Sequence, residues 1–539
     1  MEGDDPSRVW LPGIVARIAR CLSPNEVAGT LRLVDKLAAT LHQHDSISLS
    51  SVVPQHAFAA KWCAPDACRE LTCTQRRQLL CLTAGTGDLA NLKVAIAAAT
   101  MVLTPAVMGA AAAANHMEAC RVLLAQGCPL QARWHDGPLA AAAGANHQDL
   151  CDWLIAQGAE VDGQAVVAAA RHGHVELMDR LIEHNEAQPY QAHTYLCNSD
   201  VLNAIAHGCD LPTLQRWVSK LAPELGSPSF LLASAAASPT PDWRDKTAWL
   251  AEQGASRTYA GILVSRQCLG APERLEWLEQ NTGYCLEGEC LHSAIQNGRV
   301  DTVRWLLRRG LPAAEIEDRY SGAARGDLEL LQLLRDEGVL QPPSRFLNEA
   351  LRAGLQEAAA WLLRECRAAD PRFTLSTRHM AVASSSGSVR LMAWLQGQGC
   401  PVDGSSWDWG LGRYAPRLGA VVSGCEAALR WLAEQGVEPP ADGMPYATAA
   451  RNGDLRTLAV LQRLGVPYGP SDGSVFMSLL PGSPRGPPGA PLPALRLLAE
   501  VGLPVDWRAA REAAAEREDL DREEVLAWIQ ERIEAEGGV

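Results

Sequence analysis

Lysine is scarce in this chain of 539 residues, with five lysines among 48 basic residues. Phenylalanine and tyrosine are also few, at five and eight, whereas tryptophan reaches 16. The 16 cysteines include no CxxC pair and are too sparse for a disulfide scaffold, so we expect reduced thiols in an intracellular protein, cytoplasmic, nuclear or both. No apolar run follows the acidic N-terminus, which gives no sign of a secretory signal peptide.

Several classes of function are excluded by what the chain does not carry. A net charge of −14 and a pI near 5.5 argue against a phosphate-backbone binder, so we expect no nucleic acid partner. The uncharged stretch 94–117 is mostly alanine and contains Pro105, so we expect no membrane span. GxSxG, P-loop and HExxH motifs are absent, which predicts a protein that is not an enzyme and needs no cofactor.

Two groups of possible metal ligands are weak. Cys63, Cys68 and Cys73 are each separated by four residues, and the second group is Cys285, Cys290 and His292. Neither contains a CxxC pair, and burial of these side chains in helices explains both groups more simply. We therefore expect no metal site.

A repeated phrase runs through most of the chain. Tryptophan and leucine, with glycine four residues after the leucine, recur as WLIAQG at 153, WLAEQG at 249, WLLRRG at 305, WLQGQG at 394 and WLAEQG at 431. With its degenerate copies the phrase marks about 15 units, most often about 28 residues apart. Such a period predicts a solenoid, in which each unit packs only on its neighbours.

Other columns of the repeat predict that each unit is a pair of helices. Glycine or asparagine stands seven residues before the tryptophan column, as at Gly87, Asn115 and Gly173, and tolerates the left-handed backbone of a tight turn. Alanine stands eleven residues before it and allows close helix approach. Glycine five residues after it ends the second helix. Nine tryptophans share the main column, and we expect these rings to pack between neighbouring repeats: Trp153, Trp217, Trp249, Trp277, Trp305, Trp361, Trp394, Trp431 and Trp528.

The segment DGPLAAAAGANH at 136–147, followed by LCDWLIAQGAEVD, resembles the ankyrin repeat. The resemblance extends over about residues 79–535, with a shorter unit and with tryptophan where the family has leucine or valine. It implies an all-α, ankyrin-like helix-turn-helix solenoid of about 14–15 repeats that binds other proteins. We expect His116, His147 and His174, which follow the turn column, to bond to the backbone.

The first fifty residues form a different module. The segment 10–41 carries apolar residues at helical spacing on either side of Ser23-Pro24-Asn25-Glu26, a capping box that starts a second helix. This segment resembles an F-box, a family that binds the Skp-type adaptor of cullin-based ubiquitin ligases. The resemblance implies an adaptor-binding role for Leu11, Pro12, Ile14, Val15, Ile18, Leu22, Val27, Leu31 and Val34. The alternative is a pair of helices that only caps the solenoid.

The organisation predicted is an F-box-like module at 1–50, a linking or capping segment at 51–78 and the solenoid at 79–535. Insertions between repeats are the expected partner contacts, because they fall on loops. The insertion at 401–419 carries hot-spot residue types in a glycine-rich loop: Trp407, Trp409, Arg413, Tyr414 and Arg417. The alternative is that these rings fold back onto the repeat below. Two further insertions lie at 469–493 and 185–199.

Two functions are consistent with these features. The first is a substrate-recruiting subunit of a cullin-type ubiquitin ligase, monomeric on its own, whose module docks the Skp-type adaptor while the repeats hold the target. The second is an interaction scaffold with no ligase link.

Overall fold

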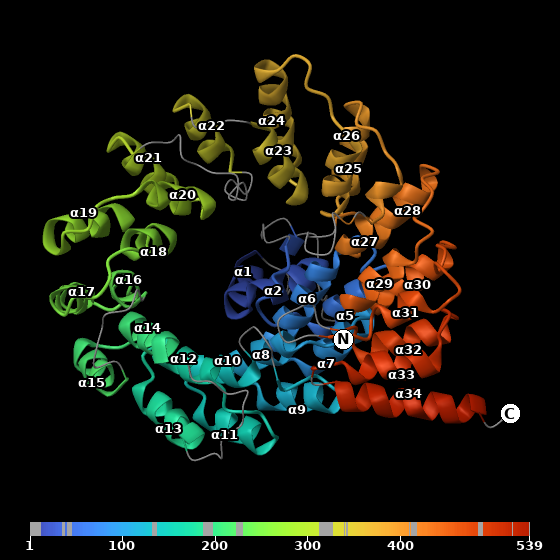
Figure 1. The fold of residues 1–539 in the computed structure, drawn as a ribbon, viewed down its shortest axis with the longest axis horizontal. Coiled ribbons are helices and arrows are strands. Elements are labelled where there is room, and N and C mark those ends of the chain that lie inside the picture. The colour runs from blue at the N-terminus through green and yellow to red at the C-terminus, as the bar shows by residue number, and fades with distance from the viewer. Residues whose placement is uncertain are drawn as a thin grey trace, which may run out of the picture.

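A computed structural model of the chain describes residues 12–34, 38–39, 46–131, 137–186, 198–221, 230–311, 327–338, 340, 343–408, 410, 418–482, 489–519 and 521–537. These residues build an all-α helical repeat solenoid (Figure 1). The solenoid curves into a ring, and one continuous hydrophobic core follows it from Val53 to Ile529. The predicted fold class is confirmed.

Each repeat is a pair of antiparallel helices, and along most of the ring the first helix of each pair faces the centre (Figure 1). The first helices are α6 (Cys73–Gly85), α8 (Pro105–Ala113), α10 (Pro138–Gly144), α12 (Gly163–Arg171), α14 (Asn198–Gly208), α16 (Leu231–Ala236), α18 (Ala260–Gln267), α20 (Gly288–Gln296), α23 (Pro343–Arg352), α25 (Thr377–Ser384), α27 (Ala420–Ser423), α29 (Met444–Arg451), α31 (Ser474–Met477) and α33 (Trp507–Ala515).

The second helices follow along the outer rim. They are α7 (Leu89–Ala99), α9 (Met117–Ala125), α11 (Gln148–Ala156), α13 (Val175–Glu186), α15 (Leu211–Leu221), α17 (Trp243–Glu252), α19 (Ala271–Thr282), α21 (Val300–Arg308), α22 (Leu328–Asp336), α24 (Gln356–Ala369), α26 (Val389–Gly397), α28 (Glu426–Glu434), α30 (Leu455–Arg463), α32 (Leu492–Glu500) and α34 (Arg522–Gly537). Every second helix except α22 therefore has its first helix among the described residues.

The repeat columns have the physical roles predicted from the sequence. All nine alanines of the small-residue column are fully buried, so the first helices of neighbouring repeats approach closely: Ala111, Ala142, Ala169, Ala206, Ala294, Ala350, Ala383, Ala420 and Ala449. The turn column adopts positive φ at nine positions, including 73° at Gly87 and 60° at Asn115. Gly270 differs, because it caps α19 with a φ of −94°.

Histidines after the turn column link each repeat to the one before. The Nε2 atom of His116 bonds to the carbonyl oxygen of Gly85 at 3.1 Å. His147 bonds in the same way to Ala113, and His174 to Gly144, each at 3.0 Å. These bonds satisfy carbonyl groups near the ends of the preceding first helices, which have no partner within their own helix. The predicted structural role of these histidines is confirmed.

The nine column tryptophans are buried or half-buried, and none is exposed. The guanidinium of Arg121, in the preceding outer helix, lies 5.8 Å from the ring centre of Trp153. Arg335 stacks in the same way on Trp361 at 5.5 Å. Each of these rings therefore lies between neighbouring repeats, where a cation–π contact adds about 0.5–1 kcal/mol at a partly exposed site.

The two ends of one superhelical turn meet and close the ring, as the blue and orange helices of Figure 1 show. The first repeat, α6 and α7, lies against the pairs α27/α28 and α29/α30. Three backbone hydrogen bonds cross this junction: Val102 N to Gly453 O at 2.9 Å, Arg456 N to Thr100 O at 3.0 Å, and Ala427 N to Arg69 O at 3.0 Å. We call the contact between 65–102 and 424–463 the closure junction.

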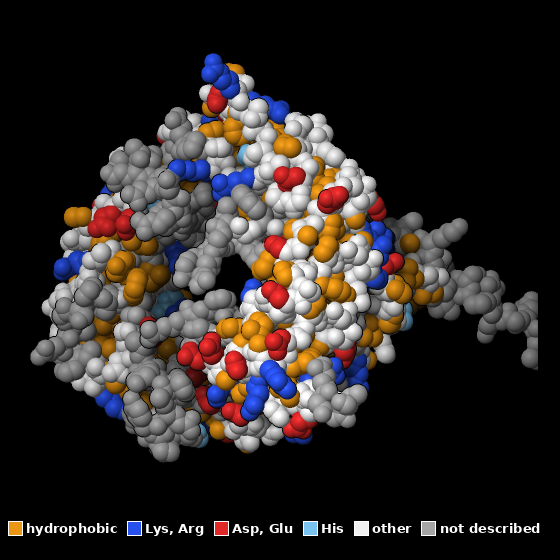
Figure 2. All heavy atoms as spheres, turned by 45° about the vertical axis from the view of Figure 1, so that its right-hand side comes forward, with side chains coloured by type: hydrophobic (Ala, Val, Ile, Leu, Met, Phe, Trp, Pro, Cys, Tyr) orange, Lys and Arg blue, Asp and Glu red, His pale blue; other side chains and the backbone are white. Residues whose placement is uncertain are grey.

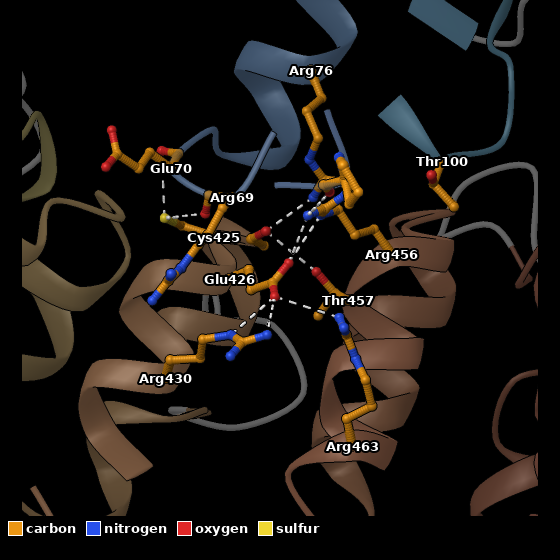
Figure 3. A network of polar contacts seen from close by, with 12 residues as sticks. Arg69, Glu70, Arg76, Thr100, Cys425, Glu426, Arg430, Arg456, Thr457 and Arg463 are labelled. Atoms are coloured by element: carbon orange, nitrogen blue, oxygen red, sulfur yellow. Dashed lines mark hydrogen bonds and ion pairs between the residues drawn. The ribbon is translucent and has the colours of Figure 1, made fainter. Parts of the chain in front are cut away.

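A buried ion pair lies in the closure junction, and Figure 3 shows the polar network around its Arg76. Arg76 and Asp454 are both almost completely buried, and the guanidinium donates two hydrogen bonds to the carboxylate, at 2.9 and 2.6 Å. Arg76 also donates to the carbonyl oxygens of Ala99 and Gly424, at 3.1 and 2.9 Å. Both carbonyls lie where a helix ends, so the cation lies where the helix dipoles favour positive charge.

Asp454 also caps the N-terminus of α30. Its carboxylate accepts from the backbone N–H of Thr457 at 3.0 Å and from the hydroxyl of the same residue at 2.7 Å. Desolvating two charges costs several kcal/mol per ion, which only good geometry and further hydrogen bonds offset. Between them, Arg76 and Asp454 have those further bonds, since two carbonyls accept from the guanidinium and Thr457 donates twice to the carboxylate.

Glu426 is a second buried carboxylate at the closure junction, and three arginines surround it (Figure 3). Arg430 and Arg456 donate to it at 2.7 and 2.8 Å, and Arg463 lies at 3.4 Å. Burial alone would raise the pKa of Glu426, but the arginines hold it below its ordinary value of 4.5. Arg456 also donates to the carbonyl oxygen of Pro65 at 3.3 Å, so this cluster includes the N-terminal side of the junction.

Removing one partner of the Arg76–Asp454 pair should open the closure junction. We expect Asp454→Asn to cost about 3–5 kcal/mol, because a buried guanidinium loses its counter-charge. The double variant Arg76→Leu/Asp454→Leu should cost less than the sum of the two single changes. The measurement is the urea midpoint followed by tryptophan fluorescence. As a control, Arg304→Ala removes an exposed pair with Glu329 and should cost about 0.2–1 kcal/mol. Equal effects of Asp454→Asn and Arg304→Ala would contradict a closed ring.

Two glycines with similar backbone conformation distinguish the effect of backbone strain from the effect of a clash at the closure junction. Gly424 and Gly436 have φ of 65° and 70°, so alanine strains both positions similarly. Only at Gly424 would a Cβ atom meet the closure junction, lying 3.0 Å from Arg76 Nη2 and 3.1 Å from Cys73 Cβ, whereas at Gly436 nothing lies within 4 Å. We expect Gly424→Ala to lower stability by about 1–3 kcal/mol more than Gly436→Ala, measured by thermal unfolding. The same shift in both variants would show that the junction is open in solution.

Candidate interaction surfaces

The N-terminal module is built from α1 (Pro12–Cys21) and a second helix of three parts, α2 (Pro24–Glu26), a π-helical turn (Val27–Leu31) and α3 (Arg32–Val34). The predicted capping box starts this second helix. The hydroxyl of Ser23 accepts from the backbone N–H of Glu26 at 3.3 Å, and the Glu26 carboxylate accepts from the backbone N–H of Ser23 at 2.8 Å. The module has a small core of its own, separate from that of the ring.

A buried asparagine fastens the module to the next segment. Asn25 Nδ2 donates to the carbonyl oxygens of Ser48, Ser51 and Val52, at 2.7, 3.2 and 3.0 Å, and its Oδ1 accepts from the Ser48 N–H at 2.9 Å. This chain segment leads into α5 (Gln55–Trp62), which packs on α7 of the ring. The module is therefore tied to the first repeat.

Close packing of α5 on the π-helical turn strengthens this attachment. His56 Nε2 lies 3.0 Å from the carbonyl oxygen of Gly29. A Cβ atom at Gly29 would lie 3.1 Å from the Cβ of Ala57, so only glycine lets the two helices approach this closely. The same face that anchors the module is thus unavailable to a partner.

The F-box-like residues divide into core and surface positions. Val15, Val27 and Leu31 form the buried core of the module with Ala38, so their expected contact with an adaptor is corrected to a packing role. Ile18 and Leu22 are half-buried against that core. Pro12, Ile14 and Val34 are exposed, whereas Leu11 lies outside the described residues.

Exposed apolar side chains concentrate in the first 52 residues. Seven large hydrophobic residues of the described chain are exposed, and five of them precede residue 53. We call these five the N-terminal apolar patch: Ile14, Leu33, Val34, Ile47 and Val52. Leu33 is 74% exposed. It was not among the residues predicted to bind the adaptor, because it does not lie on the helix face formed by Val27, Leu31 and Val34. A leucine off the apolar stripe of an amphipathic helix was the available signal.

The insertion at 401–419 does not present its first tryptophan to partners. Trp407 is 1% exposed, and its indole N–H donates to the carbonyl oxygen of Val437 at 3.0 Å. Beside it the Asp408 carboxylate accepts from the Thr448 hydroxyl at 2.7 Å. Trp407 is a core residue, which corrects its expected role as a partner contact. The other candidates of this insertion lie outside the described residues: Trp409, Arg413, Tyr414 and Arg417.

The two other insertions are only partly described. Ala490 and Leu492, at the end of 469–493, are buried in the main core, so this part of the insertion packs on the ring. Residues 187–197 and 483–488 lie outside the described residues.

A groove crosses four neighbouring first helices on the inner side of the ring. It has a volume of about 290 Å³ and is lined from α12, α14, α16 with the residue before it, and α18: Gln164, Val167, Arg171, Asp200, Asn203, His207, Phe230, Ser234, Leu263 and Gln267. Phe230 is 48% exposed and stacks on Tyr259, with ring centres 4.4 Å apart. We call this hollow the inner groove. Figure 2 shows, from another side, that an opening remains in the middle of the ring.

Burial shifts the pKa of several ionisable groups in the described chain. Burial raises the pKa of the thiols of Cys120 and Cys366 to about 11, so they stay protonated and weakly nucleophilic at neutral pH. Burial, with Arg171 and Lys246 nearby, lowers the pKa of His207 to about 4. No group of three or more histidine, cysteine, aspartate or glutamate side chains in the described residues is placed to hold a metal ion.

None of the helices in the described parts of the chain combines the length and the apolar character that crossing a membrane requires.

Comparison with known proteins gives no family. No family model matches the chain, and no curated protein matches it. Among solved structures, the chain is similar to the pentatricopeptide repeat protein PPR10 from maize, with 14% identity and a TM-score of 0.26 over 93% of this chain and 75% of that one. It is also similar to PPR10 in complex with an 18-nt psaJ RNA element, with 14% identity and a TM-score of 0.25 over 94% and 79%.

These superpositions are too loose to transfer a residue or a ligand to this chain. They do correct one expectation, namely that nucleic acid is excluded as a partner. The similar helical repeat protein was solved with RNA bound, so a helical repeat architecture does not exclude RNA. Net charge alone was too coarse a basis for that exclusion.

Asn25 should hold the module on the first repeat. We expect Asn25→Ala to cost about 1–3 kcal/mol locally, because three part-buried carbonyl oxygens lose their donor. The measurement is hydrogen exchange of the Ser48 amide, whose acceptor is the Asn25 side chain. Ser50→Ala is the control, since Ser50 contributes only an exposed hydroxyl contact to Ser48. Unchanged exchange at Ser48 in Asn25→Ala would contradict this attachment.

Proposed function

We propose that this protein is a protein-binding scaffold that recruits a target to a cullin-type ubiquitin ligase. In this proposal the F-box-like module docks a Skp-type adaptor, and the ring of ankyrin-like repeats holds the protein to be modified. The buried alanine column, the left-handed turns and the inter-repeat histidine bonds support an ankyrin-like repeat.

One observation carries the adaptor part of the proposal, and it is the N-terminal apolar patch. Five water-exposed leucine, isoleucine and valine side chains within the first 52 residues support a docking surface, because exposed apolar area of this kind marks interaction sites. The module is also held firmly, because Asn25 and His56 join it to the segment 48–56, and α5 of that segment packs on the first repeat. A rigidly held patch loses less conformational entropy when it binds.

The alternative function is a scaffold without a ligase link, in which the N-terminal helices only cap the solenoid. The contacts of α5 with both the module and α7 favour this alternative, because they cover one end of the repeat core. A cap needs a polar outer surface, however. The exposed Leu33 and Val34 do not provide one.

Binding to a purified Skp-type adaptor tests the proposal. We expect the wild-type chain to bind and Leu33→Glu/Val34→Glu to weaken binding at least tenfold, measured by isothermal titration calorimetry. Both side chains are exposed, so the change should leave the thermal midpoint unaltered. Leu269→Glu is the matched control, because Leu269 is 90% exposed but lies on the ring.

Two outcomes would count against the proposal. No binding by the wild-type chain would overturn the ligase link and favour the cap. Equal binding by Leu33→Glu/Val34→Glu and by Leu269→Glu would show that the patch is not the docking surface.

A further inference from the structure

The inner groove has an ordered lining that points to a class of ligand. The middle of the groove is a row of four residues, one from each repeat: Val167 of α12, Asn203 of α14, Phe230 just before α16, and Leu263 of α18. Three of the four are apolar, and the amide of Asn203 is the exception. Polar residues stand one helical turn away on either side of this row: Gln164 and Asp200 on one side, and Arg171, His207, Ser234 and Gln267 on the other. The groove therefore crosses the helices with an apolar floor and two polar edges.

The length of the groove sets the shape of its ligand. Packed helices lie about 8–10 Å apart, so three steps from α12 to α18 span roughly 24–30 Å. An extended chain advances about 3.3 Å per residue, so about eight residues cover that distance. A helix is about 10 Å across, so a flexible extended strand fits this space better.

The charge of the groove also restricts the ligand. Among the described residues that line the groove, Arg171 is the one cation and Asp200 the one carboxylate, and His207 is neutral at physiological pH because its pKa is lowered to about 4. The lining is therefore close to electroneutral, which does not favour a strongly charged ligand. Amide side chains at Gln164, Asn203 and Gln267 instead offer both donors and acceptors.

An unsatisfied acceptor lies in the middle row. The Oδ1 atom of Asn203 is shielded from solvent and accepts no hydrogen bond. A buried polar atom without a partner costs about 1–3 kcal/mol, which a ligand N–H would recover. The adjacent Phe230 has one partner ring, Tyr259, and is still about half exposed. An apolar side chain of the ligand would cover this ring while a neighbouring backbone N–H reaches Asn203.

We propose that the inner groove binds an extended, largely uncharged peptide segment of about eight residues from a partner protein. Its backbone N–H groups bond to the amide oxygens of Gln164, Asn203 and Gln267, and its apolar side chains pack on Val167, Phe230 and Leu263. The inference deepens the proposed function, since it names the site through which the scaffold takes its target. It does not involve the N-terminal apolar patch, so the two can fail separately.

Panning the full-length chain against a phage-displayed library of random eight-residue peptides tests the site. An enriched peptide is then synthesised with fluorescein, and its Kd is measured by anisotropy. We expect at least a tenfold loss of affinity in Phe230→Ala and in Asn203→Leu. Leu269→Ala, which changes an exposed side chain that does not line the groove, should leave the affinity unchanged.

Further measurements distinguish a loss of peptide binding from a loss of folding or of adaptor binding. Phe230→Ala and Asn203→Leu should keep the wild-type thermal midpoint, and both should still bind the adaptor. Leu33→Glu/Val34→Glu should keep peptide affinity. Failure of adaptor binding with intact peptide binding would overturn the proposed ligase link but not the groove.

Three results would overturn the groove. The first is a library that yields no enriched peptide. The second is a peptide that binds Phe230→Ala and Asn203→Leu as tightly as wild type. The third is a fluorescein-labelled octauridine RNA that binds more tightly than the peptide and loses affinity in the same two variants, which would assign the groove to RNA.

Discussion

The arrangement of this molecule depends on one buried ion pair between residues 378 positions apart, Arg76 and Asp454. A repeat solenoid normally has two free ends and adds each repeat on the last. Here the first repeat meets α27 to α30 of the same chain, so the start and the finish of one superhelical turn become neighbours. The closed ring with its central opening follows from that contact.

The chemistry of the closure junction differs from that of the contacts between consecutive repeats. Neighbouring repeats meet through alanine and leucine, whereas the junction contains two buried carboxylates, several arginines and three backbone hydrogen bonds. Buried ion pairs add little net stability relative to apolar packing, but a wrong partner leaves a buried charge unpaired, which is strongly destabilising. The junction therefore specifies where the ring closes more than it strengthens it.

Closure also connects the two candidate surfaces. The module is fixed through α5 to α7, and α7 ends at Ala99, whose carbonyl oxygen accepts from Arg76. The N-terminal apolar patch is thus held against the ring on a rigid support. A target in the inner groove would lie on the same closed body, which suits a scaffold that brings two proteins together.

Periodic features of the sequence were sufficient to predict the repeats. The alanine, turn and histidine columns each recur, so a single physical reason explains many positions. The closure junction is not periodic, and nothing in the sequence revealed it. Asp88 and Asp454 occupy the same column and both cap their helices, yet only Asp454 also pairs with a distant arginine.

Trp407 shows a second limit of sequence reasoning. A tryptophan in a glycine-rich insertion has the composition of a contact loop, and only the three-dimensional structure shows its ring inside the core. The groove residue Phe230 is the reverse case, because an aromatic outside the repeat columns remained exposed. Composition indicates which residues can bind, but burial decides which of them are available.

Hydrogen exchange of three backbone amides tests the closed ring most directly. The N–H groups of Val102, Ala427 and Arg456 donate to carbonyl oxygens on the opposite side of the closure junction. A closed ring predicts that these amides exchange as slowly as amides in the middle of neighbouring helices. Exchange at the rate of unprotected amides, with the helices still protected, would show an open solenoid and contradict the account.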